Sequence, residues 1–208
     1  DVKQLGSVGD SLAFTQFMTA LASRTGELLN FAALARDIGV DGKTAKRWLS
    51  ILQASGIIYL LQPFSLNIGK RIVKTPKVYF TDTGLVCYLC RWLTPETLMN
   101  GAMAGSIYET FIVSEILKSY CNAGKKPDLY FFRNTDGQEV DLVFYRDGKL
   151  FPVEIKKTSS PNPKDVKHFK TLSSFFPSLE IAEGGVICNA EQLLPIGQNI
   201  KIIPFNLI

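Results

Sequence analysis

The spacing of apolar residues over the first fifty positions predicts three short amphipathic helices. The first covers about residues 10–21, with apolar positions at Leu12, Phe14, Phe17 and Leu21. A second helix begins after the capping residue Asn30, and a third runs from the capping residue Asp41 to about Ala54. Gly39 provides the turn between them, and two short helices joined by a glycine turn are typical of a helix-turn-helix.

Two predicted strands follow the third helix. Gly56 ends that helix, and residues 57–61 and 77–80 are mainly apolar and β-branched or aromatic. A strand pair after a helix-turn-helix predicts a winged helix, in which the segment between the strands forms the wing. We therefore expect residues 1–80 to be a winged helix-turn-helix domain and residues 81–208 to be a second domain.

Positive charge is concentrated in this first predicted domain. From Asp41 to Lys77 the basic residues exceed the acidic ones by six, whereas the whole chain has a net charge of +4. Such a segment is typical of a module that faces nucleic acid, although a solvated face or contact with an acidic partner domain gives the same pattern. The candidate DNA contacts are Lys43, Lys46 and Arg47 on the third helix and Lys70, Arg71 and Lys74 in the wing.

One apparent nucleotide motif is excluded. Gly42-Lys43-Thr44 resembles the end of a phosphate-binding loop, but Asp37 stands where that motif requires glycine. The pattern before it is also helical, where the motif requires a strand. We therefore expect no nucleotide site in this chain.

The four cysteines give no metal site. Cys87 and Cys90 have ligand-like spacing, but they lie in an apolar helical run, and His168 is the only histidine. Free thiols indicate a reducing cytoplasm, and no apolar run is long enough for a bilayer. The chain begins Asp1-Val2 without Met, so we expect a piece of a longer protein.

A β-hairpin is the strongest local signal in the second half. Asp147-Gly148 is a typical two-residue hairpin turn. If these two residues form the turn, Arg146 pairs with Lys149, and the register of both strands follows from that pair.

This register brings charged residues together. Asp141 falls opposite Glu154, and Glu139 falls opposite Lys156, so the four side chains project to one face. A slip of one residue would bury these charges, so the register is well specified. The other face is apolar throughout, with Val140, Leu142, Phe144, Phe151, Val153 and Ile155.

The acidic face has the composition of a site for a divalent cation. Directly opposed carboxylates repel, and Mg²⁺ or Mn²⁺ between Asp141 and Glu154 would relieve that repulsion. A metal so held can activate water against a phosphodiester, and Lys156 can stabilise the transition-state charge. The alternative is a solvated surface with an ion pair between Glu139 and Lys156.

The surrounding pattern places this hairpin in an α/β domain. An amphipathic helix over residues 105–118 carries Glu109, which could be a further metal ligand or an ordinary solvent-facing acid. After the hairpin we expect a helix over about residues 164–175 and strands over residues 185–188 and 200–205. His168 is expected on the surface of that helix.

Two stretches carry a resemblance to a known family: Lys74 to Leu85, and the helix with Glu109 followed by Gly137-x-Glu139-Val-Asp141 and Glu154-Ile-Lys156. They resemble the C-terminal half of prokaryotic AAA-superfamily ATPases that end in a domain of unknown function. The resemblance implies an N-terminal ATPase domain in the parent chain. It also implies a restriction-endonuclease-like PD-(D/E)XK fold with a mixed central sheet flanked by helices. The implied site residues are Glu109, Asp141, Glu154 and Lys156.

Three functions are consistent with these patterns. The first is a magnesium-dependent DNA endonuclease module beside a DNA-binding winged helix. The second is a non-catalytic DNA-binding or regulatory module, and the third is a protein-interaction module of the ATPase. The acidic set favours the first, and the basic segment favours the first two over the third.

Overall fold

The structure, a computed structural model, describes residues 10–66 and 72–208. The chain divides into two compact units, each made of two segments. The first unit comprises Asp1–Leu60 and Lys77–Ser114, and the second comprises Leu61–Pro76 and Glu115–Ile208.

This division differs from the predicted boundary between residues 80 and 81. Residues after position 80 complete the core of the first unit, because Val86 and Ile107 belong to the same buried cluster as Phe14 and Trp48. Shared burial of apolar surface, rather than position along the chain, therefore sets the extent of this unit.

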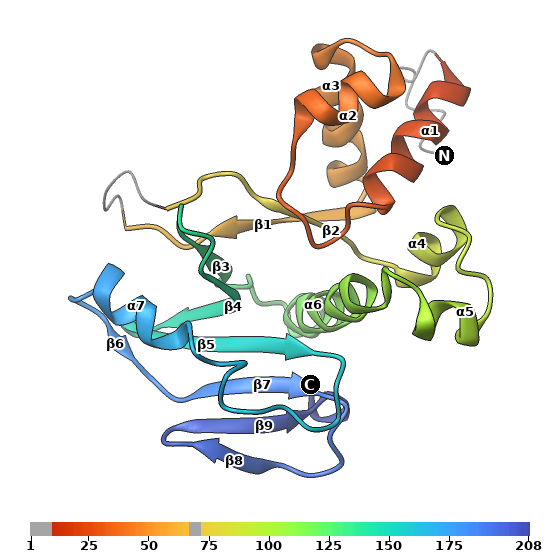
Figure 1. The fold of residues 1–208 in the computed structure, drawn as a ribbon. Helices are drawn as coiled ribbons and strands as arrows, with labels where there is room; N and C mark the ends of the chain where they lie inside the picture. Colours follow the sequence, from red (N-terminus) through yellow and green to blue (C-terminus); the bar gives the residue numbers. More distant parts are fainter. Residues whose placement is uncertain (1–9, 67–71) are drawn as a thin grey trace. The chain divides into compact units, whose positions relative to one another are not determined.

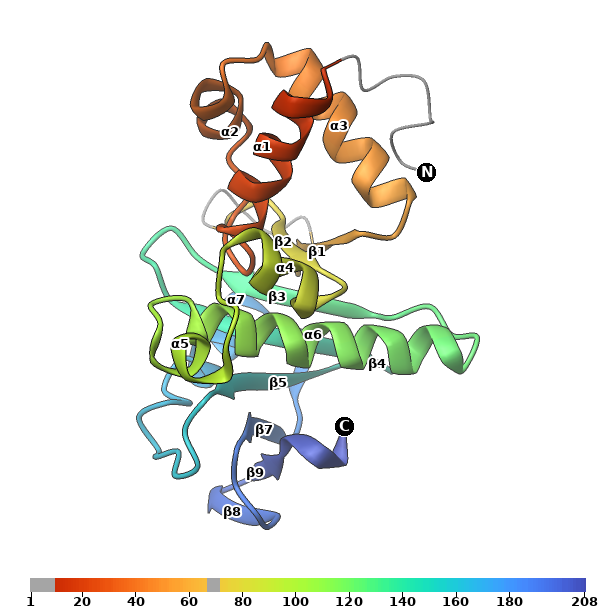
Figure 2. The same ribbon diagram turned by 90° about the vertical axis from the view of Figure 1, so that its right-hand side faces the viewer.

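Three capped helices begin the first unit, as predicted, and Figures 1 and 2 show them grouped together. Asp10, Asn30 and Asp41 are their N-caps, and each side chain accepts hydrogen bonds from backbone N–H groups of the first turn. Gly39 ends the second helix with a φ of 73°, a left-handed conformation that glycine adopts without strain. The elements of this unit are α1 (Ser11–Ala22), α2 (Phe31–Ile38), α3 (Gly42–Ala54), β2 (Lys77–Phe80), α4 (Thr83–Leu89), α5 (Pro95–Asn100), the start of β1 (Ile58–Pro63) and the start of α6 (Ala104–Asn122).

The core of the first unit is built around Trp48. The ring centroids of Phe14 and Phe17 each lie 5.5 Å from that of Trp48, in edge-to-face arrangements. Val78 and Phe80 of β2 are buried in the same cluster. The predicted helices and the predicted strand at residues 77–80 therefore share one core.

The segment between β1 and β2 belongs to the second unit. The Phe64 N–H donates to the Phe131 carbonyl at 2.8 Å, and the Val73 N–H donates to the Arg133 carbonyl at 2.9 Å. Ile72 also forms an antiparallel bridge with Asn134. The segment expected to form a wing is thus attached to β3 on both sides of residues 67–71.

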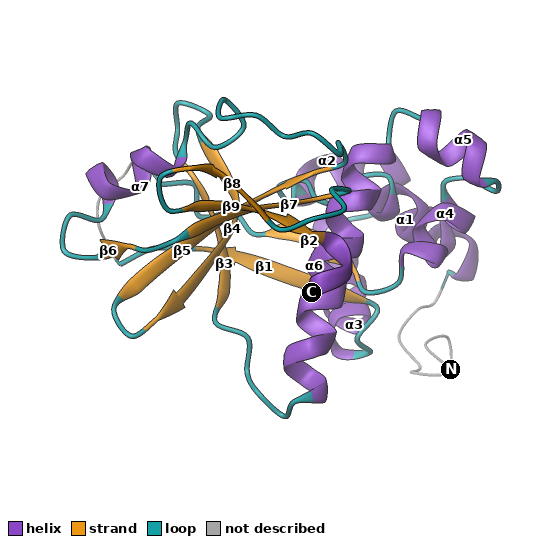
Figure 3. Cartoon of the chain, turned by 90° about the horizontal axis from the view of Figure 1, so that it is seen from below, coloured by secondary structure: helices purple, strands orange, loops and turns teal. Residues whose placement is uncertain are grey.

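The second unit contains most of the strands, and Figure 3 shows its twisted sheet in orange. Neighbouring strands follow the order β3-β4-β5-β7-β9-β8, and β6 pairs with β5. The pairs β3–β4, β4–β5 and β8–β9 are antiparallel, whereas β5–β7 and β7–β9 are parallel. The elements are β3 (Leu129–Arg133), β4 (Glu139–Arg146), β5 (Lys149–Lys156), α7 (Phe169–Phe175), β6 (Glu180–Ile181), β7 (Gly184–Cys188), β8 (Leu194–Gly197), β9 (Ile200–Pro204), η2 (Phe205–Leu207), the end of β1 and the end of α6.

Aromatic residues dominate the core of this unit. Phe176, directly after α7, packs against Phe64 with ring centroids 5.0 Å apart, and Phe175 packs against Phe132 at 5.1 Å. The predicted helix over residues 164–175 is shorter in the structure, because residues 163–168 form turns before α7. The predicted strands at residues 185–188 and 200–205 correspond to β7 and β9.

The fold class is mixed α/β, as predicted. The described strands pair in the order β2-β1-β3-β4-β5-β7-β9-β8, with β6 beside β5. The end of β1 is parallel to β3, so parallel and antiparallel pairs both occur. None of the helices described combines the length and the apolarity needed to cross a bilayer.

Candidate functional site

The β4–β5 hairpin positions the candidate site through its turn. Asp147 and Gly148 have φ values of 51° and 76°, as the predicted two-residue turn requires. Arg146 pairs with Lys149, and the same register continues along both strands to Leu142 opposite Val153. The predicted register is confirmed over these pairs, and the opposition of Asp141 to Glu154, one step further along, stays a prediction.

A bulge in β4 next to the site was not predicted. Tyr130 of β3 pairs with Val143, but Phe132 pairs with Val140, so three steps along β4 match two along β3. The extra residue lies at Asp141 and Leu142, where it interrupts the strict alternation of faces assumed from the sequence. Bulges reorient single side chains, so this one sets the direction of Asp141.

The two carboxylates near the open end of the hairpin are buried. Asp141 is 9% exposed and Glu154 is 8% exposed. The Ile155 N–H donates to Asp141 Oδ2 at 2.9 Å, and Lys156 Nζ donates to Glu154 Oε1 at 2.7 Å. This burial argues against the solvated surface considered as an alternative, because carboxylates leave water only when other groups compensate.

One lysine serves both carboxylates. Lys156 Nζ lies 2.7 Å from Glu154 Oε1 and 4.0 Å from Asp141 Oδ2. Burial alone would lower the pKa of Lys156, but the charges of Asp141 and Glu154 and the hydrogen bond to Glu154 raise it above its ordinary value. Lys156 is therefore a cation at neutral pH, and with both carboxylates ionised the three groups carry one net negative charge.

The turn before α7 brings two more titratable residues near Lys156. The charge of Asp165 contributes to the raised pKa of Lys156. Burial, followed by the charges of Lys167 and Lys156, lowers the pKa of His168, which stands at the N-cap of α7 without a side-chain capping bond. Neither interaction was predicted, because Asp165 and His168 lie nine and twelve positions after Lys156 and His168 was expected on a helix surface.

Glu139 has a partner that the sequence did not indicate. Its Oε2 lies 2.9 Å from Nη1 of Arg133, the residue opposite it on β3. Glu139 was predicted opposite Lys156 because only the pairing of β4 with β5 was considered. The other edge of β4 pairs with β3, which supplies Arg133.

Glu109 lies in the first unit and takes part in a polar contact there. Its Oε1 accepts hydrogen bonds from Lys77 Nζ at 3.0 Å and from the Tyr79 hydroxyl at 2.5 Å. The Lys77 side chain is only 4% exposed. The other three predicted site residues belong to the second unit, so a role for Glu109 beside Asp141 and Glu154 stays a prediction.

The donor set on the hairpin is compatible with a hard divalent cation. Carboxylate oxygens are the ligands that Mg²⁺ and Mn²⁺ prefer, and Mg²⁺ is commonly held by one or two carboxylates together with waters. Residues Asp141 and Glu154 would hold such an ion. Across residues 10–66 and 72–208, acidic, His and Cys side chains form no group of three or more suited to a metal.

The basic residues of α3 have the exposure that a nucleic-acid contact requires. Lys43, Lys46 and Arg47 are all exposed, and Lys46 Nζ lies 5.8 Å from the centroid of the Phe31 ring. Lys74 is exposed as well. Lys70 and Arg71, the other predicted wing residues, lie outside the described residues.

Comparisons with known proteins cover the whole chain. Residues 1–96 match a family model described as a domain of unknown function (DUF8612), and residues 104–208 match a second one, also a domain of unknown function (DUF4143). Uncharacterized proteins of Mycobacterium bovis and Mycobacterium tuberculosis are each 29% identical to the chain over 209 residues. These alignments cover all of this chain but only 45% of each relative. No solved structure matches. The C-terminal match covers half of the chain, which thus belongs to the family with the domain of unknown function DUF4143.

Proposed function

We propose that the second unit is a metal-dependent nuclease module with a PD-(D/E)XK-like fold, and that α1–α3 with β1 and β2 form a DNA-binding winged helix. One observation carries the proposal: two buried carboxylates from adjacent central strands contact the same lysine. Asp141 on one strand and Glu154-x-Lys156 on the next is the arrangement that metal-assisted phosphodiester cleavage requires.

The roles of the residues follow from their contacts. The Ile155 N–H fixes one oxygen of Asp141, so this carboxylate is oriented before any ligand arrives. A divalent cation held by Asp141 and Glu154 would lower the pKa of a bound water and polarise the phosphodiester. Lys156, a cation at neutral pH, would stabilise the negative charge that develops on the phosphate.

DNA would be held by the first unit. Lys43, Lys46 and Arg47 extend from the second helix of the helix-turn-helix pattern, the helix that such modules direct at DNA. The resemblance to AAA-superfamily ATPases supports a parent chain with an ATPase domain, and the chain spans only 45% of the length of its relatives.

A second candidate is a non-catalytic DNA-binding or regulatory module. The specific observation in its favour is the 2.7 Å contact between Lys156 and Glu154, because an ammonium group already occupies part of the place of a metal. In that case Lys156 is a permanent counter-ion and no cation binds.

Calorimetric titration with Mg²⁺ and Mn²⁺, combined with nicking of supercoiled DNA, separates the two candidates. We expect wild-type protein to bind metal and nick DNA, and Asp141→Asn to lose both. The matched control is Asp136→Asn, which removes one charge from an exposed turn directly before β4 and should behave as wild type.

The outcomes differ for each candidate. Loss of metal binding and nicking in Asp141→Asn, but not in Asp136→Asn, supports the nuclease. Equal metal binding by wild type and Asp141→Asn, or no binding by either, contradicts it and favours the non-catalytic module.

A further inference from the structure

A pocket of about 630 Å³ lies in the second unit at the turn end of the β4–β5 hairpin, away from the acidic pair. Arg146 and Asp141 are five residues apart on β4, which corresponds to about 17 Å of extended strand. The pocket is within the size range of small-ligand and nucleotide sites. It is therefore a separate feature from the candidate metal site.

Flat aromatic rings form part of the pocket wall. Phe144 and Phe151 are cross-strand neighbours on the hairpin, and Tyr120 comes from the last turn of α6. All three are partly exposed, and none contacts another aromatic ring among the residues described. Ring faces that no aromatic neighbour covers are available to stack on a planar ligand.

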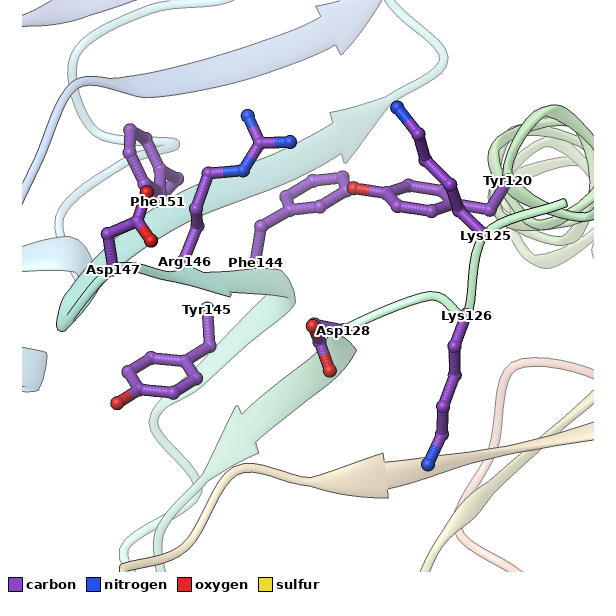
Figure 4. A pocket seen from close by; sticks show the side chains of 9 residues that line it. All are labelled: Tyr120, Lys125, Lys126, Asp128, Phe144, Tyr145, Arg146, Asp147 and Phe151. Carbon is purple, nitrogen blue, oxygen red and sulfur yellow. The ribbon is translucent and has the colours of Figure 1, made fainter. Parts of the chain in front are cut away.

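Three basic side chains share the pocket with these rings. Lys125, Lys126 and Arg146 are exposed, and none of them has an ion-pair partner in the described part of the chain. Figure 4 shows Lys125 and Arg146 extending toward one space beside the rings of Phe144 and Tyr120. Five other cations of the second unit are paired with acids: Lys118, Arg133, Lys149, Lys156 and Lys201.

We propose that this pocket binds single-stranded nucleic acid, with a base stacked on Phe144 and phosphates held by Lys125 and Arg146. A charged surface alone would suit any polyanion, but the aromatic wall selects ligands with planar groups. Asp128 and Asp147 also line the pocket and reduce its net positive charge, so charge contributes less here than stacking. An acidic peptide has the charge but lacks the planar groups.

The test measures binding of a fluorescent short oligothymidylate by anisotropy, in EDTA and over a series of salt concentrations. Phe144→Leu keeps an apolar side chain but removes the ring, and should weaken binding about tenfold. Lys125→Ala with Arg146→Ala should reduce the salt dependence of log affinity by about 0.7 for each cation removed. EDTA removes metal, so failure of the nuclease proposal would leave this result unchanged.

Two controls locate the effect. Lys118→Ala removes one charge from the same unit outside the pocket and should bind oligothymidylate as wild type. The triple variant Lys43→Ala, Lys46→Ala and Arg47→Ala should lose affinity for duplex DNA and keep affinity for oligothymidylate.

Several results would overturn the inference. One is a folded Phe144→Leu protein that binds oligothymidylate with the same affinity as wild type. A second is a loss of oligothymidylate affinity in Lys118→Ala as large as the loss in the pocket variants. A third is displacement of oligothymidylate by polyglutamate to the same extent from wild type and from Phe144→Leu, which would identify a site for an acidic protein. Competition by thymidine monophosphate as strong as that by the oligonucleotide would identify a mononucleotide site instead.

Discussion

The two units hold their buried and partly buried acidic groups in different ways. In the first unit one carboxylate, Glu109, accepts hydrogen bonds from one lysine and one tyrosine hydroxyl. In the second unit two carboxylates, Asp141 and Glu154, both contact Lys156, at 4.0 and 2.7 Å. The first contact is a balanced pair of one carboxylate and one lysine, whereas the second brings two buried carboxylates to the same lysine. Carboxylates gathered in this way repel each other, and such clusters are typical of functional sites.

The largest effect should come from breaking the balanced pair. Lys77→Met leaves Glu109 without its buried cation, and we expect the free energy of unfolding to fall by about 3 kcal/mol. Urea denaturation followed by circular dichroism measures the change. The exposed pair of Lys118 and Glu115 provides the control, because Lys118→Ala should cost no more than about 0.5 kcal/mol. Similar small decreases in the free energy of unfolding for Lys77→Met and Lys118→Ala would show that the ion pair of Lys77 with Glu109 does not stabilise the fold.

Removal of the shared lysine should have an intermediate effect. Lys156→Met takes the lysine away from two buried carboxylates, and we expect a loss of about 1–2 kcal/mol at neutral pH, discounted because the Lys156 side chain is 36% exposed.

This effect should depend on pH in a defined direction. The pKa of Lys156 is raised in the folded state, so its stabilising contribution is present below the ordinary lysine value of 10.5. It is lost as the pH rises through the folded value. Urea denaturation of wild type and Lys156→Met, at neutral pH and at high pH, gives the difference between their free energies of unfolding. This difference should be smaller at high pH. A difference that stays constant would mean that Lys156 stabilises the fold through packing alone.

The smallest effect should have the opposite sign. Asp141→Asn removes one of the two negative charges beside Lys156 and keeps an oxygen that can accept the Ile155 N–H, so in EDTA we expect stabilisation by about 1 kcal/mol. Thermal unfolding in EDTA and in Mg²⁺ measures it: Mg²⁺ should stabilise wild type but not the variant. Glu109→Gln is the comparison from the balanced site and should destabilise. Destabilisation by both substitutions would remove the distinction between the two arrangements.

Local signals predicted much of this fold. Asp10, Asn30 and Asp41 cap helices where the sequence placed them, because capping needs only neighbours within one turn. Asp147 and Gly148 fix the hairpin register for a similar reason, since both residues adopt the positive φ values that such a turn requires.

Features that depend on distant partners were not predicted. The bulge at Asp141 arises from pairing with β3, and the attachment of residues 61–76 to that strand joins positions some sixty residues apart. The contacts of Glu109 with Lys77 and Tyr79 likewise join positions at least thirty residues apart. No local pattern of hydrophobicity or charge specifies such partners, so the acidic residues were identifiable from sequence but their individual counter-ions were not.

The path of the chain through β1 also bears on how this protein could be divided. The polypeptide leaves the first unit after Leu60 and rejoins it at Lys77, having contributed hydrogen bonds to β3 on the way. A cut at residue 80 would therefore take from the C-terminal piece the residues that cover one edge of its sheet, and would leave an uncovered strand open to aggregation. The two units alternate along the chain, so biochemical work on either is best done with residues 61–76 kept in the protein.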